Sequence, residues 1–258
     1  MRRLPSFVST CIALSLSVVP LAAFSSSATP DVVLTTMQRE LKRATTALAN
    51  SDPAPYFMSY AVSDIDGTAI VASYGGVIFS TSGVHRQGDV MMHVGSLALD
   101  NTHNQSRQSG IISGSLPLDN DADAMARVLW QLTDREYEQA SGAFARVKTN
   151  TAVQADEEDK SPDFSAQAPQ THEDFAQFPA FSAQKAWEER TRKISLLFLK
   201  YPAVYTSVVF FTASSDRSYL ATSEGTALVR PAAMVRLILQ GETRADDGTE
   251  LMRVESFQ

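Results

Sequence analysis

Cysteine is almost absent from this sequence of 258 residues, in which Cys11 is the only one. Cys11 lies inside an apolar stretch near the N-terminus and does not end that stretch, as the modified cysteine of a lipoprotein would. We expect the stretch to be removed from the mature protein, which then retains no cysteine. Disulfide bonds are therefore excluded, and packing alone must stabilise the fold.

The sequence also lacks the motifs of nucleophilic and phosphate-binding enzymes. It contains no Gly-x-Ser-x-Gly sequence, which would place a serine nucleophile on a tight turn. Gly75-Gly76 is followed by residues typical of a strand, whereas a phosphate-binding loop leads into the N-terminus of a helix. The carboxylate pairs Asp64/Asp66 and Asp246/Asp247 lie where we expect turns, which explains them without acid–base catalysis. No catalytic or cofactor-binding residue is predicted.

The four histidines do not have the spacing of a zinc site. No pair follows His-Glu-x-x-His, which brings two imidazoles to one face of a helix. His93 lies in an apolar run and is predicted to be a core residue, His103 a hydrogen-bonding loop residue, and His172 part of a linker. A site of three histidines is geometrically possible, but we predict no metal ligand among these residues and His85, because they are scattered over strand, loop and linker.

Basic residues are fewer than acidic residues in this sequence. The chain has 22 Lys and Arg against 29 Asp and Glu, a formal charge of −7. Removal of Arg2 and Arg3 with the leader would make the mature chain more acidic still. This acidity disfavours nucleic acid, whose binding depends on neutralising phosphates, and anionic membrane surfaces. The remaining basic cluster, residues 190–193, follows Glu188 and Glu189 and is typical of the solvated face of a helix.

The N-terminus has the order of a signal peptide. Arg2 and Arg3 precede a mostly apolar run over residues 7–24, and Ser26-Ser27-Ala28 offers small residues for cleavage before Thr29. The alternative is a membrane anchor, but serines and a proline interrupt the run of about 18 residues and no basic stop follows it. We predict that residues 1–28 are a cleaved signal peptide and that the mature protein is periplasmic or secreted, with no membrane attachment.

The remaining sequence predicts an α+β fold in which antiparallel sheets or a hairpin meander pack with about three long helices. Apolar residues recur at helical spacing over residues 31–50, from about 121 to 148, and around Trp187. Strand-like runs are separated by Asp, Gly and Ser, which is typical of hairpins. The expected strands cover residues 56–62, 69–81, 90–98, 205–213, 217–221, 226–240 and 251–257.

The predicted connections divide the chain. Turns are expected at residues 64–67, 83–88, 214–216, 223–225 and 246–248, a bulge at Gly75-Gly76, and a long polar loop at 99–118. The acidic residues of 119–123 cap the second helix, because the spacing lacks the glycine and glutamate of a calcium loop. We predict an N-terminal α+β domain over residues 29–150, an acidic, proline-containing linker over 151–180, and a helix plus β-meander over 181–258 that begins a second domain.

The last third of the chain resembles the TldD/PmbA family of metallopeptidases, in its exported branch. The similarity is densest around the Ser223-Glu-Gly-Thr226 turn and Asp246-Asp-Gly-Thr-Glu-Leu251, and looser blocks extend it over nearly all of the mature chain. The other matching blocks are Trp187, Ile194-Ser195, Tyr201-Pro202, 205–211, Tyr219, Arg230-Pro231, Pro55-Tyr56-Phe57, Ala72-Ser73-Tyr74-Gly75, Leu99-Asp100-Asn101-Thr102-His103, Pro117-Leu118-Asp119 and Trp130.

The resemblance implies a zinc peptidase whose metal site, built around a His-Glu-x-x-x-His helix, belongs to a C-terminal domain. This sequence contains no such motif, so no catalytic or metal residue can be transferred. The resemblance therefore implies the N-terminal, non-catalytic portion of such a peptidase, inactive alone, whose partner is the C-terminal catalytic region or a homologous subunit. Zinc is expected only in that missing domain.

Two alternatives stay open. The family pairs a zinc-bearing subunit with a metal-less one, so the chain could be the metal-less partner of such a complex. It could instead be an exported module that binds peptides along a sheet edge. The alternating residues of 251–257 and the apolar run 235–239 predict an uncovered strand, and so a chain that self-associates or is marginally stable alone.

Overall fold

The computed structural model describes residues 30–103, 110–153, 161–177 and 184–258. The predicted signal peptide, residues 1–28, and the acidic run 155–159 of the expected linker lie outside the described residues. None of the helices in the described ranges is both long and apolar enough to span a membrane.

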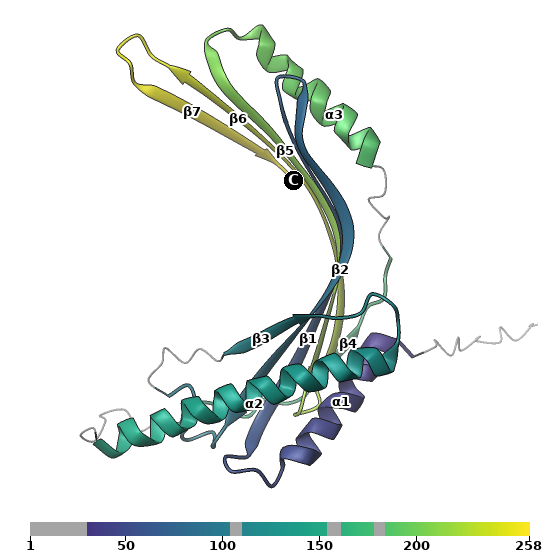
Figure 1. The fold of residues 1–258 in the computed structure, drawn as a ribbon, viewed down its shortest axis with the longest axis vertical. Helices are drawn as coiled ribbons and strands as arrows, with labels where there is room; N and C mark the ends of the chain where they lie inside the picture. Colours follow the sequence, from purple (N-terminus) through teal and green to yellow (C-terminus); the bar gives the residue numbers. More distant parts are fainter. Residues whose placement is uncertain (1–29, 104–109, 154–160, 178–183) are drawn as a thin grey trace, which may run out of the picture.

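The described residues form three α-helices and one mostly antiparallel sheet of seven strands, which confirms the α+β class (Figure 1). The strand order is β3-β2-β1-β5-β6-β4, and β7 pairs with β6. The helices are α1 (Val32–Leu48), α2 (Ala122–Val153) and α3 (Gln184–Leu196), and the 3-10 turn η1 (Leu197–Lys200) follows α3. The strands are β1 (Pro55–Ser73), β2 (Gly76–Val94), β3 (Ile111–Ser115), β4 (Thr171–Glu173), β5 (Val204–Thr222), β6 (Ala227–Arg244) and β7 (Glu250–Phe257).

Two long hairpins, β1/β2 and β5/β6, lie side by side and give the sheet its length. β1 pairs with β5 in unbroken register from Ser59↔Thr222 to Ala72↔Val209. The strands are therefore continuous where the sequence predicts turns at residues 64–67, 83–88 and 214–216, and those three predictions are wrong. We call these three segments the waist.

The waist is polar because the strands there pass between two separate helix layers. α1 and α2 cover one end of the sheet and α3 covers the other, so most side chains between them stay at least partly exposed (Figure 1). Arg86 is an exception, because it is only 6% exposed and its Nη1 lies 3.7 Å from Met125 Sδ of α2. Backbone groups are still satisfied, since Asp64 is in register with Arg86 on one side and Arg217 on the other. Polar side chains that remain in contact with water are compatible with a strand, because the two neighbouring strands supply the hydrogen bonds of its backbone.

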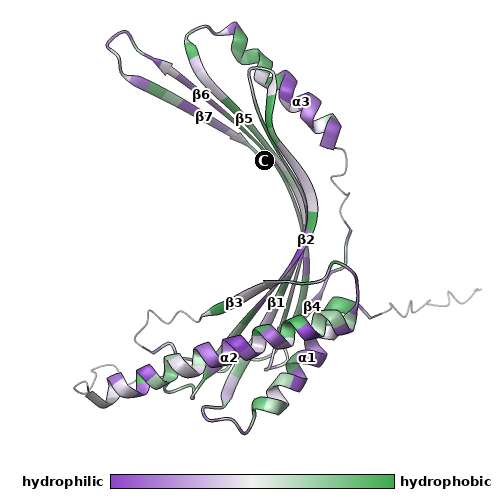
Figure 2. Ribbon diagram, in the orientation of Figure 1, coloured by the Kyte–Doolittle hydropathy of each residue, from purple (hydrophilic) through white to green (hydrophobic). Residues whose placement is uncertain are grey.

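Both helix layers lie on the same face of the sheet. Residues with even numbers along β1 share one face, and Tyr60 and Val62 are buried under α1 and α2 while Ile70 is buried under α3. We call this the helix face and the opposite one the open face. In Figure 1 α3 lies on the outer side of the curved sheet, and Figure 2 shows hydrophilic and hydrophobic residues mixed along α2 and α3, as expected for helices with one face on a sheet.

The cores are unequal in size. The larger one fills the space beneath α1 and α2 and contains Met37, Met58, Tyr60, Met92, Met125 and Leu129, each at most 1% exposed. The smaller one lies beneath α3, where the Trp187 ring stacks on Phe211 with their centroids 4.3 Å apart.

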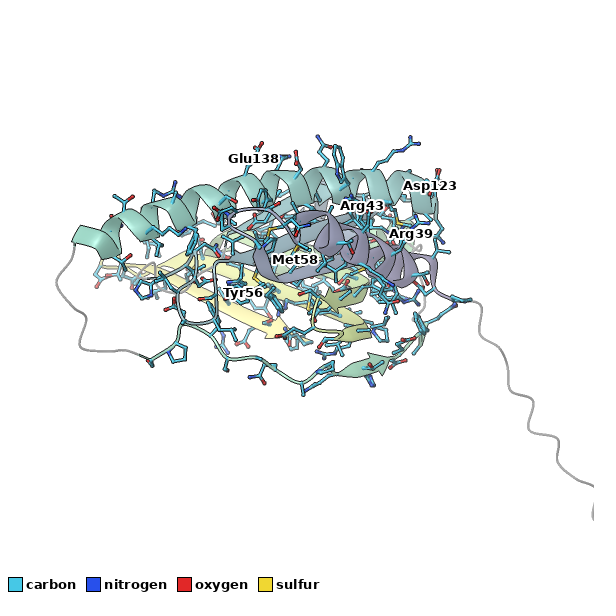
Figure 3. The ribbon with its side chains drawn as sticks, turned by 90° about the horizontal axis from the view of Figure 1, so that it is seen from below. Arg39, Arg43, Tyr56, Met58, Asp123 and Glu138 are labelled. Carbon is cyan, nitrogen blue, oxygen red and sulfur yellow. The ribbon has the colours of Figure 1, made fainter. Side chains whose placement is uncertain are left out.

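Polar contacts join α1 to α2 on the outside of the larger core. Arg39 Nη2 donates to the Ala122 carbonyl at 3.2 Å and to Asp123 Oδ1 at 3.3 Å, and Figure 3 shows Arg39 and Asp123 side by side. The Asp31 side chain accepts from the Leu34 N–H at 3.0 Å and begins α1 as an N-cap.

Several local predictions need correction. Tyr74 and Gly75, both with positive φ, form the two-residue turn of the first hairpin, and the bulge lies at Val71/Ala72 instead of Gly75-Gly76. The expected loop 99–118 contains β3, which pairs with β2, and the expected linker contains β4, which pairs with β6 in parallel. The turns at 223–225 and 246–248 are confirmed, with Gly225 and Gly248 at positive φ.

Candidate functional site

A buried polar cluster lies on the open face, beneath the loop that follows β2. Asp100 is fully buried at its centre. Its Oδ2 accepts a hydrogen bond from the Tyr56 hydroxyl at 2.8 Å and lies 2.9 Å from His93 Nδ1. Its Oδ1 accepts from the Thr102 N–H at 2.7 Å and the Thr102 hydroxyl at 2.5 Å. Four donors thus converge on one carboxylate.

A second carboxylate, Asp163, extends the cluster. Its Oδ2 accepts from the Asp100 N–H at 3.0 Å, and its Oδ1 lies 2.8 Å from His103 Nδ1. The backbone of Asp100 therefore links two His–Asp pairs. The cluster ties together β2, the loop 96–103 and the segment that begins at residue 161.

The electrostatics favour a charged Asp100 and a protonated Tyr56. Burial by itself would raise the pKa of Asp100, but the hydrogen bonds from His93, Thr102 and Tyr56 outweigh it and lower that pKa below its usual value. Burial, and then the hydrogen bond to Asp100, raise the pKa of Tyr56 far above its usual value. Donor and acceptor thus keep their roles across the physiological pH range.

Among the described residues, aromatic rings enclose the cluster. The ring of Phe164 contacts His93 edge-on at 4.6 Å between centroids, Phe57 contacts it at 5.6 Å, and only 6% of His93 is exposed. We interpret the cluster as a clamp that holds the loop 96–103 and residues 163–164 on the sheet. His93 is buried and His103 is hydrogen-bonded, as predicted, but the two belong to one network and are not scattered.

The other two histidines lie elsewhere. His85 lies in β2 at the waist, opposite Ile65, and His172 lies in the exposed edge strand β4. Among the described residues no group of three or more His, Cys, Asp or Glu side chains is arranged to hold a metal ion.

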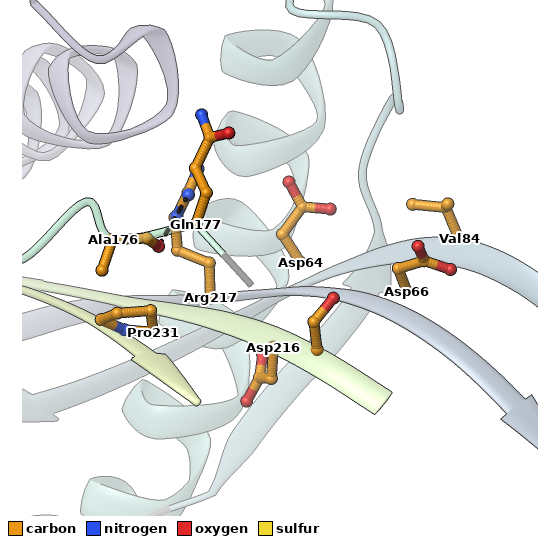
Figure 4. A pocket seen from close by; sticks show the side chains of 9 residues that line it. Asp64, Asp66, Val84, Ala176, Gln177, Asp216, Arg217 and Pro231 are labelled. Carbon is orange, nitrogen blue, oxygen red and sulfur yellow. Dashed lines mark hydrogen bonds between the residues drawn. The ribbon is translucent and has the colours of Figure 1, made fainter. Parts of the chain in front are cut away.

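A polar cleft of about 300 Å³ lies at the waist, between the two helix layers. Figure 4 shows Asp64, Asp66 and Arg217 around it, with Ala176 and Gln177 from the segment that crosses it. Arg86 Nη2 donates to Asp64 Oδ2 at 2.6 Å, and Arg217 Nη2 donates to the Ala176 carbonyl at 3.4 Å. Arg86 and Asp64 thus form an ion pair at the cleft, whereas Asp216 Oδ1 and Arg217 Nε are buried there without a hydrogen-bond partner among the described residues.

Glu136 of α2 is a buried carboxyl without a full set of partners. Only 1% of it is exposed, and its Oε2 has no hydrogen-bond partner in the part of the chain that the structure describes. Burial raises the pKa of Glu136 to about 7, and a hydrogen bond from the Met92 backbone offsets only part of that shift. The group changes charge near neutral pH while packed between α2 and β2.

The open face carries a row of apolar side chains that no described segment covers. In register across the sheet, Phe79 lies beside Val71, Val71 beside Phe210, and Phe210 beside Ile238. Phe79 is 51% exposed and Phe210 is 40% exposed. We call the open-face patch the set Val71, Phe79, Phe210, Met234, Ile238 and Val254.

Sequence reasoning missed both the cluster and the patch. His103 and Asp163 are 60 residues apart, so no local spacing could relate them. The patch did leave a signal: residues 208–211 are apolar at four successive positions, which is typical of a strand covered on both faces. α3 covers one face of that run in the described structure.

No family model matches the sequence, and no curated protein matches it either. The fold is similar to that of TldE from Thermococcus kodakarensis, with 9% identity, a TM-score of 0.46, and coverage of 86% of this chain and 42% of that one. A candidate modulator of a DNA gyrase from Thermotoga maritima has 9% identity, a TM-score of 0.41, and coverage of 85% and 42%. Another, from Bacteroides thetaiotaomicron, has 9% identity, a TM-score of 0.46, and coverage of 86% and 44%.

This chain therefore spans less than half the length of each of these solved structures. At 9% identity the likeness is one of fold. The three structures are members of the TldD/PmbA family, which is the family that the sequence of this chain resembles.

Proposed function

We propose that this chain is the N-terminal, non-catalytic portion of an exported TldD/PmbA-type peptidase and that its open face binds the C-terminal catalytic region of such a protein. The observation that supports the proposal is the open-face patch. Phe79, Phe210, Met234 and Val254 are each between 40% and 51% exposed, and they lie on one face of one sheet. Contiguous apolar surface of this kind marks an interaction site.

Charged side chains also lie on the open face. Arg236 of β6 lies between Met234 and Ile238 of the patch, in register with Thr212 of β5, and Arg230 lies further along the same strand. Arginine is enriched in protein interfaces, where it accompanies apolar side chains. The resemblance to the family supplies the identity of the partner, and the predicted signal peptide supplies the export.

In this proposal the chain alone neither holds zinc stoichiometrically nor cleaves peptides. Zinc requires three or four converging ligands, whereas His93 and His103 are each engaged with an aspartate in the clamp. We expect metal analysis of the purified chain to find far less than one zinc per chain. About one tightly bound zinc per chain, lost on substitution of His93 or His103, would contradict this expectation.

The binding role is tested by adding a separately expressed, zinc-bearing C-terminal domain of a TldD/PmbA protein to the full chain. We expect a complex by sedimentation and a higher melting temperature, because binding to the native state alone stabilises it. Phe210→Asp should weaken that complex about tenfold or more, since it puts a charge at the centre of the patch.

Leu118→Asp is the matched control, because Leu118 is 52% exposed and lies outside the open-face patch. It should leave the affinity unchanged. Equal loss with both variants, or no binding by the unmodified chain, would refute the proposed interface. Binding to a metal-less family subunit but not to the catalytic domain would favour the role of a homologous partner subunit.

A further inference from the structure

β7 is an edge strand of the sheet that the described residues form. It pairs with β6 on one side, and no described strand lies on the other. All eight of its residues are exposed, and Figure 1 shows β7 at the margin of the sheet, away from α1 and α2. A free edge presents a row of unpaired backbone N–H and C=O groups to any strand that can align with it.

The geometry of the β6/β7 hairpin determines which residues of β7 direct their backbone N–H and C=O groups toward the free edge. The Ala245 N–H donates to the Thr249 carbonyl at 2.8 Å, so these two residues form a hydrogen-bonded pair beside the turn. In an antiparallel ladder such pairs recur at every second residue. Leu251, Arg253, Glu255 and Phe257 therefore bond to β6, and the backbone groups of Glu250, Met252, Val254 and Ser256 point toward the free edge.

We propose that β7 pairs with β7 of a second copy of this chain, antiparallel about a twofold axis at Val254. In that register Arg253 lies opposite the partner's Glu255, and Glu255 lies opposite the partner's Arg253. Leu251 lies opposite the partner's Phe257, and Val254 opposite the partner's Val254. Opposite charges and apolar pairs placed directly across two strands stabilise a sheet.

The charges of Arg253 and Glu255 favour the register with its axis at Val254 over registers with the axis at an adjacent residue. An axis at Arg253 would place the two copies of Arg253 opposite each other, and an axis at Glu255 would do the same with two carboxylates. An axis at Met252 would oppose Arg253 to Leu251. Among the described residues Arg253 and Glu255 form an ion pair with each other at 2.6 Å, and their side chains are 85% and 49% exposed. The second copy offers each of them a partner across the strands.

The pairing would join the two sheets into one. Val254 is in register with Gln240, which is in register with Val208 on the open face, so Val254 lies on that face too. A twofold axis at Val254, perpendicular to the sheet, keeps both open faces on the same side. The dimer would therefore present two open-face patches on one continuous surface. The pairing itself does not depend on the partner proposed above.

Exchanging the charges of Arg253 and Glu255 tests the register. The dissociation constant of the dimer is measured by sedimentation of the full chain over a range of concentrations. The unmodified chain should be in a monomer–dimer equilibrium. Glu255→Arg should weaken the dimer about tenfold, because it creates two like-charged pairs across the axis, and Arg253→Glu should do the same. The double variant Arg253→Glu/Glu255→Arg restores both opposite pairs and should return the dissociation constant to within about threefold of the original.

Cross-linking tests the axis. In a Cys11→Ser background, Val254→Cys should form a disulfide-linked dimer under oxidation, since only residue 254 faces its own copy. Met252→Cys is the matched control. It points to the same edge, but four residues of offset separate its two copies by about 14 Å, which is too far for a disulfide.

Val254→Pro removes an outward N–H without breaking a bond to β6, so the monomer should fold and the dimer should be lost. A chain that remains monomeric at about 100 μM would overturn the proposal. A dimer that Val254→Pro leaves intact, equal cross-linking at positions 252 and 254, or failure of the double charge exchange to restore binding would also overturn it. A monomer that takes up an extended peptide along β7 would assign the edge to a peptide instead.

Discussion

Replacing Asp100 with alanine is expected to lower the free energy of unfolding by about 3–5 kcal/mol. The carboxylate is fully buried and receives hydrogen bonds from Tyr56 and Thr102 as well as the contact with His93 Nδ1. Its removal leaves those buried donors without an acceptor, and each unsatisfied donor costs free energy. Urea unfolding followed by circular dichroism measures the loss.

Three further variants show whether the loss of unfolding free energy is specific to the hydrogen bonds of the clamp. Asp100→Asn keeps the shape but directs an amide N–H₂ at donors, so we expect a loss of about 2–3 kcal/mol. Tyr56→Phe removes one hydrogen bond and should cost about 1 kcal/mol. Asp134→Ala, at an exposed position of α2, should change stability by less than about 0.5 kcal/mol. Similar losses for Asp100→Ala and Asp134→Ala would show that Asp100 does not act as the centre of a clamp.

The contribution of Asp100 to the free energy of unfolding should decrease in acid. Because the folded pKa of Asp100 is lowered, its contribution to stability is present above the unfolded value of 3.8 and is lost as the pH falls through the folded pKa. The difference in unfolding free energy between the unmodified chain and Asp100→Asn should therefore shrink below about pH 4.

Glu136 should make the fold less stable as the pH rises from about 4.5 to about 7. The unfolded carboxyl loses its proton near pH 4.5, whereas the folded one keeps it until about pH 7. Between these values the native state holds more protons than the unfolded state, so the free energy of unfolding falls with increasing pH. The shift corresponds to a total of about 3 kcal/mol, at about 1.4 kcal/mol per pKa unit.

Glu136→Gln isolates this effect, because the amide does not titrate. The pH profile of the variant should lack the fall between pH 4.5 and 7 that the unmodified chain shows. Glu136→Met, which removes the buried charge, should raise the unfolding free energy at pH 8 by about 2 kcal/mol. Parallel pH profiles for the unmodified chain and Glu136→Gln would show that this carboxyl is not responsible.

The helices were predictable from sequence because each carries its own signal. Asp31 caps α1, and the apolar stripe that includes Leu34 and Leu41 recurs at helical spacing. The Ser223–Gly225 and Asp246–Gly248 turns were predictable for a similar reason, since their glycines adopt backbone conformations that other residues avoid. These features depend on residues within a few positions of one another.

The length of the strands was not predictable in this way. Asp64, Gly67 and the Ser214-Ser215-Asp216 segment have the composition of turns, yet they continue as strands because neighbours on both sides satisfy their backbone groups. Whether such a residue turns or extends depends on what lies beside it, and one of its two neighbours comes from more than a hundred residues away, as Arg217 does for Asp64. The gap between the helix layers explains the polarity.

The sequence alone determined the α+β class, the three helices, the confirmed turns, and the resemblance to the TldD/PmbA family. The tertiary structure alone decided which residues meet: Asp100 with Tyr56 and His93, Asp163 with His103, and the apolar side chains of the open face with one another. The physical reason is the separation, along the sequence, of the residues that interact. Helix caps, helix stripes and glycine turns are set by local geometry, whereas burial and the pairing of distant strands arise only when the whole sheet has formed.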